Sequence, residues 1–161
     1  MQNNTKKKKI CMVGEFAVGK TSITQKFVNN VFSEKYLTTV GVKIDTTTID
    51  DVKLVIWDIA GRDSLSPINL NYLVGASGVI IVADGTRVET LESVPDLQKT
   101  VEERLGGVPC VIALNKKDSA AWDVEDKQRE QLKQCNLPLI ETSAKEGESI
   151  EKLFKTLSDL L

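Results

Sequence analysis

The chain has 161 residues, a length typical of one domain with a buried core. Its net charge of −2 argues against binding to nucleic acid or to membranes through bulk charge. No apolar run approaches the roughly 20 residues that span a bilayer, and the N-terminus lacks the apolar core of a signal peptide. The odd number of cysteines and the absence of histidine argue against a disulfide framework or a zinc site. We therefore expect a cytoplasmic globular protein without membrane insertion.

The two ends of the sequence carry no targeting signal that we recognise. Lys6–Lys9 is a short basic run, which we interpret as a solvated entrance to a strand rather than as a lipid-headgroup patch. The sequence ends in LSDLL with no cysteine nearby, so no prenylation signal or other lipid anchor is visible within it. A longer tail, or a place within a larger chain, stays open.

Apolar runs alternate along the chain with amphipathic segments, without a repeat or a linker between them. In chain order, the pattern predicts a strand at Ile10–Val13, a helix at Lys20–Val28, two strands joined by a turn at Asp50–Asp51 with the second at Lys53–Trp57, a helix at about Pro67–Val74, a strand within Gly78–Thr86, a helix at Leu91–Leu105, a strand within Pro109–Asp118, a helix at Val124–Cys135, a strand within Pro138–Lys145 and a helix at Ser149–Leu161.

Strands that alternate with helices pair in parallel through right-handed crossovers, and the hairpin adds one antiparallel edge strand. We therefore expect residues 1–161 to form a single domain, a three-layer α/β/α sandwich around a six-stranded, mostly parallel sheet. Ligands of such sheets bind beyond the carboxyl ends of the strands. The polar residues that follow several of the predicted strands fall there.

The segment GEFAVGKTS follows the first predicted strand and leads into the first predicted helix, and it fits the phosphate-loop pattern. Glycines let successive backbone N–H groups turn toward an anion, and the helix N-terminus adds partial positive charge. Lys20 would contact the β- and γ-phosphates of a nucleotide, and the Thr21 hydroxyl would bind Mg²⁺. The residues expected to hold the nucleotide here are Gly14, Glu15, Phe16, Ala17, Val18, Gly19, Lys20, Thr21 and Ser22.

The segment NKKD follows a later apolar strand and contains Asn115, Lys116 and Asp118. A carboxylate accepts hydrogen bonds from two neighbouring donors, and guanine offers N1–H and its 2-amino group side by side. Adenine lacks this pair, so Asp118 would select guanine. Asn115 would bond near the O6/N7 edge of the base or tie loops together, and the stem of Lys116 would lie along the purine face. Such a polar segment on its own is also typical of an ordinary turn.

The segment ETSAK ends the last predicted strand. The backbone N–H of Ala144 would donate to the guanine carbonyl, and Ser143 and Lys145 would support the turn. A helix-capping turn would explain the same residues, and the two interpretations are compatible.

Three further residues are candidates for the metal and the terminal phosphate. Asp58 in WDIAG would hold Mg²⁺ through water, and the backbone N–H of Gly61 would approach the γ-phosphate. Thr39 in YLTTVG would complete the Mg²⁺ shell with its hydroxyl, although a β-branched residue in front of a strand is also ordinary strand sequence.

These five motifs, in this order, resemble those of the Ras superfamily of small GTPases from Lys9 to Leu161. The Thr39-Val40-Gly41 stretch, WDIAG and ETSAK are most similar to the Rab branch. The resemblance implies a P-loop NTPase fold and a switch that binds GTP or GDP with Mg²⁺ and hydrolyses GTP. It implies that Phe32 flanks the guanine and that Tyr36 closes over the phosphates. It also implies switch segments around Thr39 and Gly61–Tyr72, where effectors, exchange factors or activating proteins bind.

The sequence departs from the family where water is positioned for attack. The residue after Gly61 is usually a glutamine and here is Arg62, which has donors but no acceptor for a water proton. Phe16 stands where Ras proper has glycine and would crowd the approach of an activator's arginine. With Lys20, Thr39, Gly61 and Arg62 as the catalytic candidates, we expect slow intrinsic hydrolysis. The segment from Thr39 to Asp58 is also a few residues short, so a partner that binds the hairpin tip would lose contacts.

Two other function classes stay open. A binding module would hold the nucleotide without turnover and act through partners, and an enzyme that uses ATP would need a different base-reading residue from Asp118. Partner contacts would use apolar side chains of the switch segments, unless most of these pack on the sheet. They are Val40, Ile59, Leu65, Ile68, Leu70 and Tyr72.

Overall fold

The computed structural model describes residues 6–35, 39–61 and 69–161. The strands form one six-stranded sheet in the order β2-β3-β1-β4-β5-β6. All neighbouring strands are parallel except β2 and β3, which are antiparallel, as the sequence predicts. The strands are β1 (Lys6–Gly14), β2 (Val42–Ile49), β3 (Val52–Ile59), β4 (Gly78–Asp84), β5 (Cys110–Asn115) and β6 (Leu139–Glu141).

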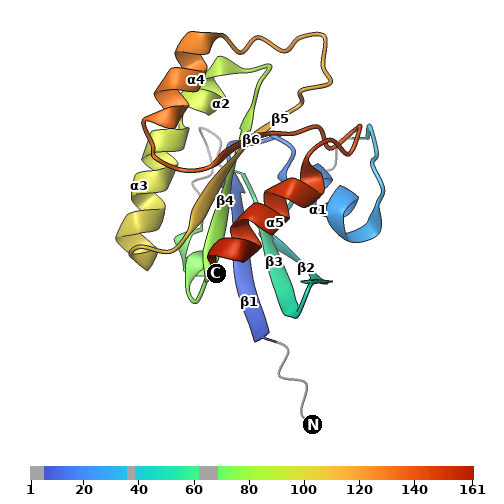
Figure 1. Ribbon diagram of the computed structural model, residues 1–161, viewed down its shortest axis with the longest axis vertical. Coiled ribbons are helices and arrows are strands. Elements are labelled where there is room, and N and C mark those ends of the chain that lie inside the picture. The colour runs from blue at the N-terminus through green and yellow to red at the C-terminus, as the bar shows by residue number, and fades with distance from the viewer. Residues whose placement is uncertain (1–5, 36–38, 62–68) are drawn as a thin grey trace.

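Helices cover both faces of this sheet. In Figure 1, α1 and α5 lie over one face, and α2, α3 and α4 lie on the other side. This arrangement confirms the expected three-layer α/β/α sandwich, the architecture of a P-loop NTPase. The helices are α1 (Lys20–Asn29), the 3₁₀ helix η1 (Leu70–Leu73), α2 (Val88–Glu92), α3 (Val94–Leu105), α4 (Asp126–Lys133) and α5 (Ile150–Leu160).

The central strands are apolar along their length because helices cover both of their faces. Every residue of β4 and of β5 is buried. Successive side chains point to opposite faces of a strand. Accordingly, Ile80 and Val82 belong to the core under α1 and α5, whereas Val79 and Ile81 belong to the core on the other face.

The predicted hairpin is confirmed. Ile49 pairs with Val52, so β2 and β3 are joined by the two residues Asp50 and Asp51. Asp50 has a φ of 50°, in the left-handed region that aspartate tolerates better than most residues. The hairpin makes β2 the edge strand of the sheet. The first residue of β2, Val42, pairs with Ile59 at the end of β3, the end of the sheet where the phosphate loop lies.

The first strand is longer than predicted because the apolar pattern marks only its buried part. It begins at Lys6 instead of Ile10, and the lysines pair with β3 in the register Lys6–Val52 to Lys9–Val55. Backbone hydrogen bonds to a neighbouring strand do not require apolar side chains. The basic run is therefore part of the strand itself.

The helix predicted at Leu91–Leu105 is two helices. α2 begins at Val88 and ends at Glu92, and α3 begins after Ser93. Pro95 lies in the first turn of α3, where it lacks the N–H that would continue the ladder and its ring would crowd the carbonyl of Leu91. The hydroxyl of Ser93 donates to the carbonyl of Thr90 at 2.8 Å and helps to close the break.

The helix predicted at Pro67–Val74 is much shorter among the described residues, which begin again at Asn69. Only the 3₁₀ turn of η1 forms, and Asn69 accepts a hydrogen bond from the N–H of Asn71 at 3.1 Å. Asparagine side chains that bond to the local backbone compete with α-helix formation. Gly75, with a φ of 82°, follows and turns the chain toward β4.

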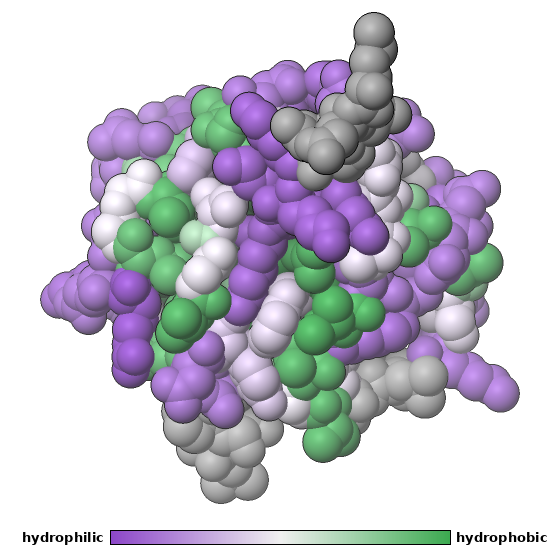
Figure 2. Space-filling model, turned by 90° about the horizontal axis from the view of Figure 1, so that it is seen from below, coloured by the Kyte–Doolittle hydropathy of each residue, from purple (hydrophilic) through white to green (hydrophobic). Residues whose placement is uncertain are grey.

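The described parts of the chain contain no helix that is both long and apolar enough to cross a bilayer. Figure 2 views the molecule from the end that lies lowest in Figure 1, where hydrophilic residues run across the face between separate hydrophobic groups. Such scattered apolar exposure is usual for protein surfaces.

The core beneath α5 provides a test of the fold. Phe154 is fully buried and stacks on Phe27 of α1 with ring centroids 3.9 Å apart. We expect Phe154→Ala to lower the free energy of unfolding by about 3–5 kcal/mol, because it leaves a cavity between helix and sheet. Urea unfolding at a fixed nucleotide concentration measures the change. Leu160→Ala, on the same helix but 49% exposed, is the control and should cost well under half as much. Equal losses in the two variants would contradict this packing.

Candidate functional site

The turn between β1 and α1 lies at the carboxyl edge of the sheet, where β4 and β5 also end. Gly19 has a φ of 103°, and a Cβ there would lie 2.2 Å from the amide nitrogen of Asn115. A Cβ on Gly14 would lie 2.5 Å from the carbonyl oxygen of Val82. Both glycines are thus required by close approach, as the phosphate-loop pattern predicts. Ala17 also has positive φ, at 62°.

The residues of the NKKD segment bind the loops of this edge to one another. Asn115 is 2% exposed and donates from its side chain to the carbonyl of Val18 at 3.1 Å. Its side-chain oxygen accepts from the hydroxyl of Thr142 at 3.1 Å and from the N–H of Ala144 at 3.3 Å. The ammonium of Lys116 donates to the carbonyl of Ala17 at 3.0 Å. Of the two roles expected for Asn115, the described contacts place it in the loop-tying one.

Asp118 lies beyond this buried amide and faces the cavity. Its Oδ1 accepts a hydrogen bond from the hydroxyl of Ser143 at 2.7 Å. This hydrogen bond from Ser143 fixes the orientation of the Asp118 carboxylate. Lys145 forms an ion pair with Glu34 at 3.2 Å, which connects the last loop to the segment after Phe32.

Thr21, Thr39 and Asp58 converge at the other end of the cavity, although they come from α1, the segment before β2, and β3. The two threonine hydroxyls are 2.7 Å apart, and the Thr21 hydroxyl also donates to Oδ2 of Asp58. Oδ1 of Asp58 is buried without a hydrogen-bond partner among the described residues. An orphaned carboxylate oxygen beside two hydroxyls is a hard oxygen donor set, which fits Mg²⁺.

Burial controls the charges at this end. Burial raises the pKa of Asp58, while the Thr21 hydrogen bond and the Lys20 charge act against that rise. Burial likewise lowers the pKa of Lys20 to about 8, although the charges of Asp58 and Glu15 oppose the shift. Lys20 donates to the carbonyl of Glu15 at 3.2 Å across the loop. A polyanion in the cavity would favour the charged form of Lys20.

Gly61 lies against the phosphate loop. A Cβ on Gly61 would be 2.7 Å from Cα of Phe16 and 2.8 Å from its backbone nitrogen. Only a glycine fits this approach, so its backbone can contact whatever the loop holds. The Phe16 side chain is 36% exposed and lines the same cavity.

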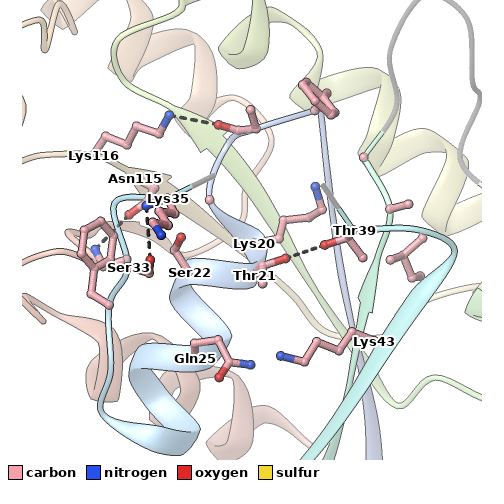
Figure 3. A pocket seen from close by; sticks show the side chains of 18 of the residues that line it. Lys20, Thr21, Ser22, Gln25, Ser33, Lys35, Thr39, Lys43, Asn115 and Lys116 are labelled. Atoms are coloured by element: carbon pink, nitrogen blue, oxygen red, sulfur yellow. Dashed lines mark hydrogen bonds between the residues drawn. The ribbon is translucent and has the colours of Figure 1, made fainter. Parts of the chain in front are cut away.

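These residues surround one cavity of about 970 Å³, large enough for a nucleotide. Figure 3 shows Lys20, Thr21, Ser22 and Gln25 on α1 facing Thr39 and Lys43, with Asn115 and Lys116 at the far side. The predicted site residues that line it are Phe16, Ala17, Gly19, Lys20, Thr21, Ser22, Phe32, Thr39, Gly61, Asn115, Lys116, Asp118, Ala144 and Lys145.

The other predicted site residues lie beneath the cavity or outside the described ranges. Val18 and Asp58 are fully buried and Ser143 supports Asp118 from below. Gly14 and Glu15 belong to the loop without lining the cavity. Tyr36 and Arg62 lie outside the described residues, as do Leu65 and Ile68 of the predicted apolar surface.

Ile59 was a candidate for the apolar surface of the switch segments, with packing on the sheet as the alternative, and the structure shows the packing. Ile59 is 1% exposed and packs in the core on the α3 face, on the same side of β3 as Trp57. Val40 is 88% exposed, as expected, while Leu70 and Tyr72 are partly buried against the same core.

Sequence reasoning missed several residues that line the cavity, among them two lysines and two polar residues. Lys35 and Lys43 add positive charge to its wall, and Gln25 and Ser119 add polar groups. Gln25 sits one turn beyond the motif on α1, so helical spacing alone could have indicated it. Lys35 and Lys43 belong to no recognisable motif.

A sequence model of the Ras family matches residues 9–161. "Ras-related protein SEC4" from Saccharomyces cerevisiae is 33% identical over 159 residues, 95% of this chain and 74% of that protein. "GTP-binding protein ypt1" from Schizosaccharomyces pombe is 32% identical over 157 residues, 93% of this chain and 77% of the relative. "Ras-related protein Rab-1" from Theileria parva is 35% identical over 161 residues, 95% and 73% of the two chains.

Asp118 gives a test of base selection. Asp118→Asn replaces an acceptor with an amide that presents its own donor to guanine, so we expect roughly 100-fold weaker GDP binding. Xanthosine diphosphate carries an oxygen in place of the 2-amino group and should bind the variant better than GDP does. Competition with a fluorescent nucleotide measures both. Asp123→Asn, an exposed residue of the same loop, should leave GDP binding unchanged. Undiminished preference for guanine in Asp118→Asn would contradict this role.

Proposed function

Because this chain belongs to the Ras family, within which its relatives point to the Rab branch of small GTPases, we propose that residues 1–161 act as a guanine-nucleotide switch that hydrolyses GTP slowly. One observation carries the proposal. A single cavity brings together the phosphate loop, Asp118 above its Ser143 support, and the oxygen cluster of Thr21, Thr39 and Asp58.

Guanine recognition follows from the Asp118 carboxylate. Ser143 occupies one oxygen with a 2.7 Å hydrogen bond and leaves the second available for the base. Guanine presents two adjacent donors, and a charged acceptor strengthens each hydrogen bond that it receives. Phe32, 36% exposed, lines the same cavity and would cover one edge of the base.

Mg²⁺ fits the oxygen cluster because Asp58 has a buried oxygen without a partner. Thr21 and Thr39 would hold the ion through their hydroxyls, and Asp58 would hold it through water. The ion, when bound, neutralises charge on the β- and γ-phosphates. The hydroxyls of Thr21 and Thr39 already lie 2.7 Å apart, so little rearrangement of these side chains is needed.

The chain's own groups position the phosphates. Lys20 leaves the Glu15 carbonyl for the β- and γ-phosphates, and the backbone N–H of Gly61 contacts the γ-phosphate from beside Phe16. The Thr39 side chain would hold its own segment in place only while the γ-phosphate is bound. The segments around Thr39 and Gly61 therefore act as the switches. Loss of the γ-phosphate would release both.

Hydrolysis is proposed to be slow because of Arg62 and Phe16. Arginine has five donors and no acceptor, so Arg62 cannot accept a hydrogen bond from the O–H of the attacking water. Groups that orient this water or stabilise its transition state are worth on the order of 10³–10⁵ in rate. Phe16 lines the cavity, and its bulky side chain would crowd the approach of an activator's arginine.

A second candidate is a binding module without turnover, which the same Arg62 substitution favours. The retained Lys20, Thr21, Thr39 and Asp58 favour real triphosphate handling with Mg²⁺. In either form, the exposed Val40 and the neighbouring switch segments would meet effectors, exchange factors or activating proteins in the cytoplasm.

Arg62→Gln is the direct test of slow hydrolysis. We expect this variant to hydrolyse GTP at least about tenfold faster than the wild type in a single turnover, because glutamine can orient the water. Radiolabelled GTP with Mg²⁺ gives the rate. Arg62→Ala, which removes both charge and acceptor, is the matched control and should stay as slow as the wild type.

The outcomes separate three mechanisms. Slower hydrolysis in both Arg62→Gln and Arg62→Ala would identify Arg62 as a catalytic arginine and would contradict this proposal. No turnover in any of the three proteins, with GTP still bound, would favour the binding module.

Asp58 provides a test of the metal. Chelation of Mg²⁺ should speed release of GDP from the wild type by roughly tenfold or more, since charged contacts to the phosphates are lost. Asp58→Ala should release GDP quickly with or without Mg²⁺. Asp96→Ala, on α3, should behave like the wild type. A chelator effect of wild-type size in Asp58→Ala would show that Asp58 does not hold the ion.

A further inference from the structure

The carbonyl groups of the phosphate loop accept hydrogen bonds from side chains, and one of these donors, Arg87, belongs to none of the five sequence motifs. Three successive carbonyls, those of Phe16, Ala17 and Val18, each accept a hydrogen bond from a side chain. Two of the donors belong to the NKKD segment. The three pairs are Arg87 Nη2 to Phe16 O at 2.6 Å, Lys116 Nζ to Ala17 O at 3.0 Å and Asn115 Nδ2 to Val18 O at 3.1 Å.

Carbonyl direction decides how well such a loop binds an anion. In a nest of successive N–H groups, the amides converge on the anion only if the carbonyls point away from it. Each side-chain donor therefore holds one peptide unit in the binding orientation. Arg87 does this for Phe16 from 71 residues away in the chain.

Arg87 is itself held in place by a buried carboxylate. Nε of Arg87 donates to Oδ2 of Asp84 at 3.0 Å, and Lys116 reaches the same oxygen at 2.8 Å. Oδ1 of Asp84 accepts from the backbone N–H of Thr86 at 2.8 Å and from its hydroxyl at 2.6 Å. Asp84 is fully buried, whereas the side chains of Arg87 and Lys116 stay 35% and 38% exposed. Burial alone would raise the pKa of Asp84, but the hydrogen bonds from Lys116 and Thr86 hold it below its usual value.

The backbone around Arg87 is equally constrained. Its N–H donates to the carbonyl of Asp84 at 3.0 Å, and its carbonyl accepts from the hydroxyl of Thr90 at 2.8 Å. The ring of Trp122 packs directly on Gly85, where a Cβ would approach the ring to 2.2 Å. The arginine thus projects from a constrained turn at the end of β4. Its positive charge also helps to lower the pKa of Lys20.

We propose that Arg87 is a positioning residue for the phosphate loop, which it holds in the anion-binding form through the Asp84–Arg87–Phe16 chain of contacts. The inference rests on the proposed guanine-nucleotide function and adds to it a residue that sets how long the diphosphate or triphosphate stays bound. Because Asp84 also holds Lys116, one buried carboxylate supports both the base-reading loop and the phosphate loop.

Arg87→Ala tests the inference in the full chain. We expect fluorescent GDP to leave the variant roughly 5- to 30-fold faster than the wild type, because a charge-assisted hydrogen bond to the loop is lost. Arg87→Lys keeps the charge but replaces the two donor nitrogens of the planar guanidinium with a single ammonium nitrogen, so its release rate should be intermediate. Arg104→Ala, an exposed arginine of α3, is the matched control and should release GDP at the wild-type rate.

A comparison of GDP with GMP separates positioning from general loosening of the fold. The loop acts on the β-phosphate, so the ratio of GDP to GMP affinity should fall in Arg87→Ala. A variant that weakens GDP and GMP by the same factor, or that releases GDP at the wild-type rate, would overturn the inference. If Arg87→Ala does not fold, Arg87→Gln takes its place with the same criteria. Failure of the wild type to bind guanine nucleotides would instead contradict the proposed function.

Discussion

The orientation of the peptide units in the phosphate loop is the constraint on which the rest of this site depends. A short turn between β1 and α1 must present its amides to an anion, so its carbonyls need partners on the other side. The parallel sheet supplies these partners because the ends of β4 and β5 lie at the same edge. Asn115 reaches Val18 directly from β5.

The same side chains connect nucleotide recognition to the loop. The side-chain nitrogen of Asn115 donates to Val18 in the phosphate loop. Its side-chain oxygen accepts from the N–H of Ala144 in the loop after β6. A base bound at Asp118 and a phosphate bound at the loop would therefore stabilise one shared network. This coupling explains in physical terms why base and phosphates would be held together, although the two motifs lie about a hundred residues apart in sequence.

Local patterns predict what depends on neighbours in sequence. The glycine spacing placed the phosphate loop, the Asp50–Asp51 pair placed the hairpin turn, and continuous apolar runs placed β4 and β5. Pro95 could have indicated the break between α2 and α3 from its missing N–H. The part of β1 formed by Lys6–Lys9 could not be predicted from a local pattern, because it depends on pairing with β3.

Contacts between distant segments explain most of what the sequence left out. Arg87 meets Phe16 only because β4 ends beside the loop, and Lys43 lines the cavity only because β2 folds back along β3. Ile59 lies just beyond the strand that the sequence predicts at Lys53–Trp57, yet it is the last residue of β3 and the fold buries it. Arg62 is the reverse case, because the chemistry of its side chain, read from the sequence, supports the proposal of slow hydrolysis together with Phe16.

The proposal combines firm nucleotide binding with slow cleavage, and the nucleotide that accompanies the purified protein reports on both. Acid extraction followed by chromatography identifies it. We predict close to one guanine nucleotide per chain, with a large share as GTP, because GTP taken up in the cell outlasts purification. Guanine nucleotide present only as GDP would contradict slow hydrolysis, and adenine nucleotide or none would contradict the guanine-binding site.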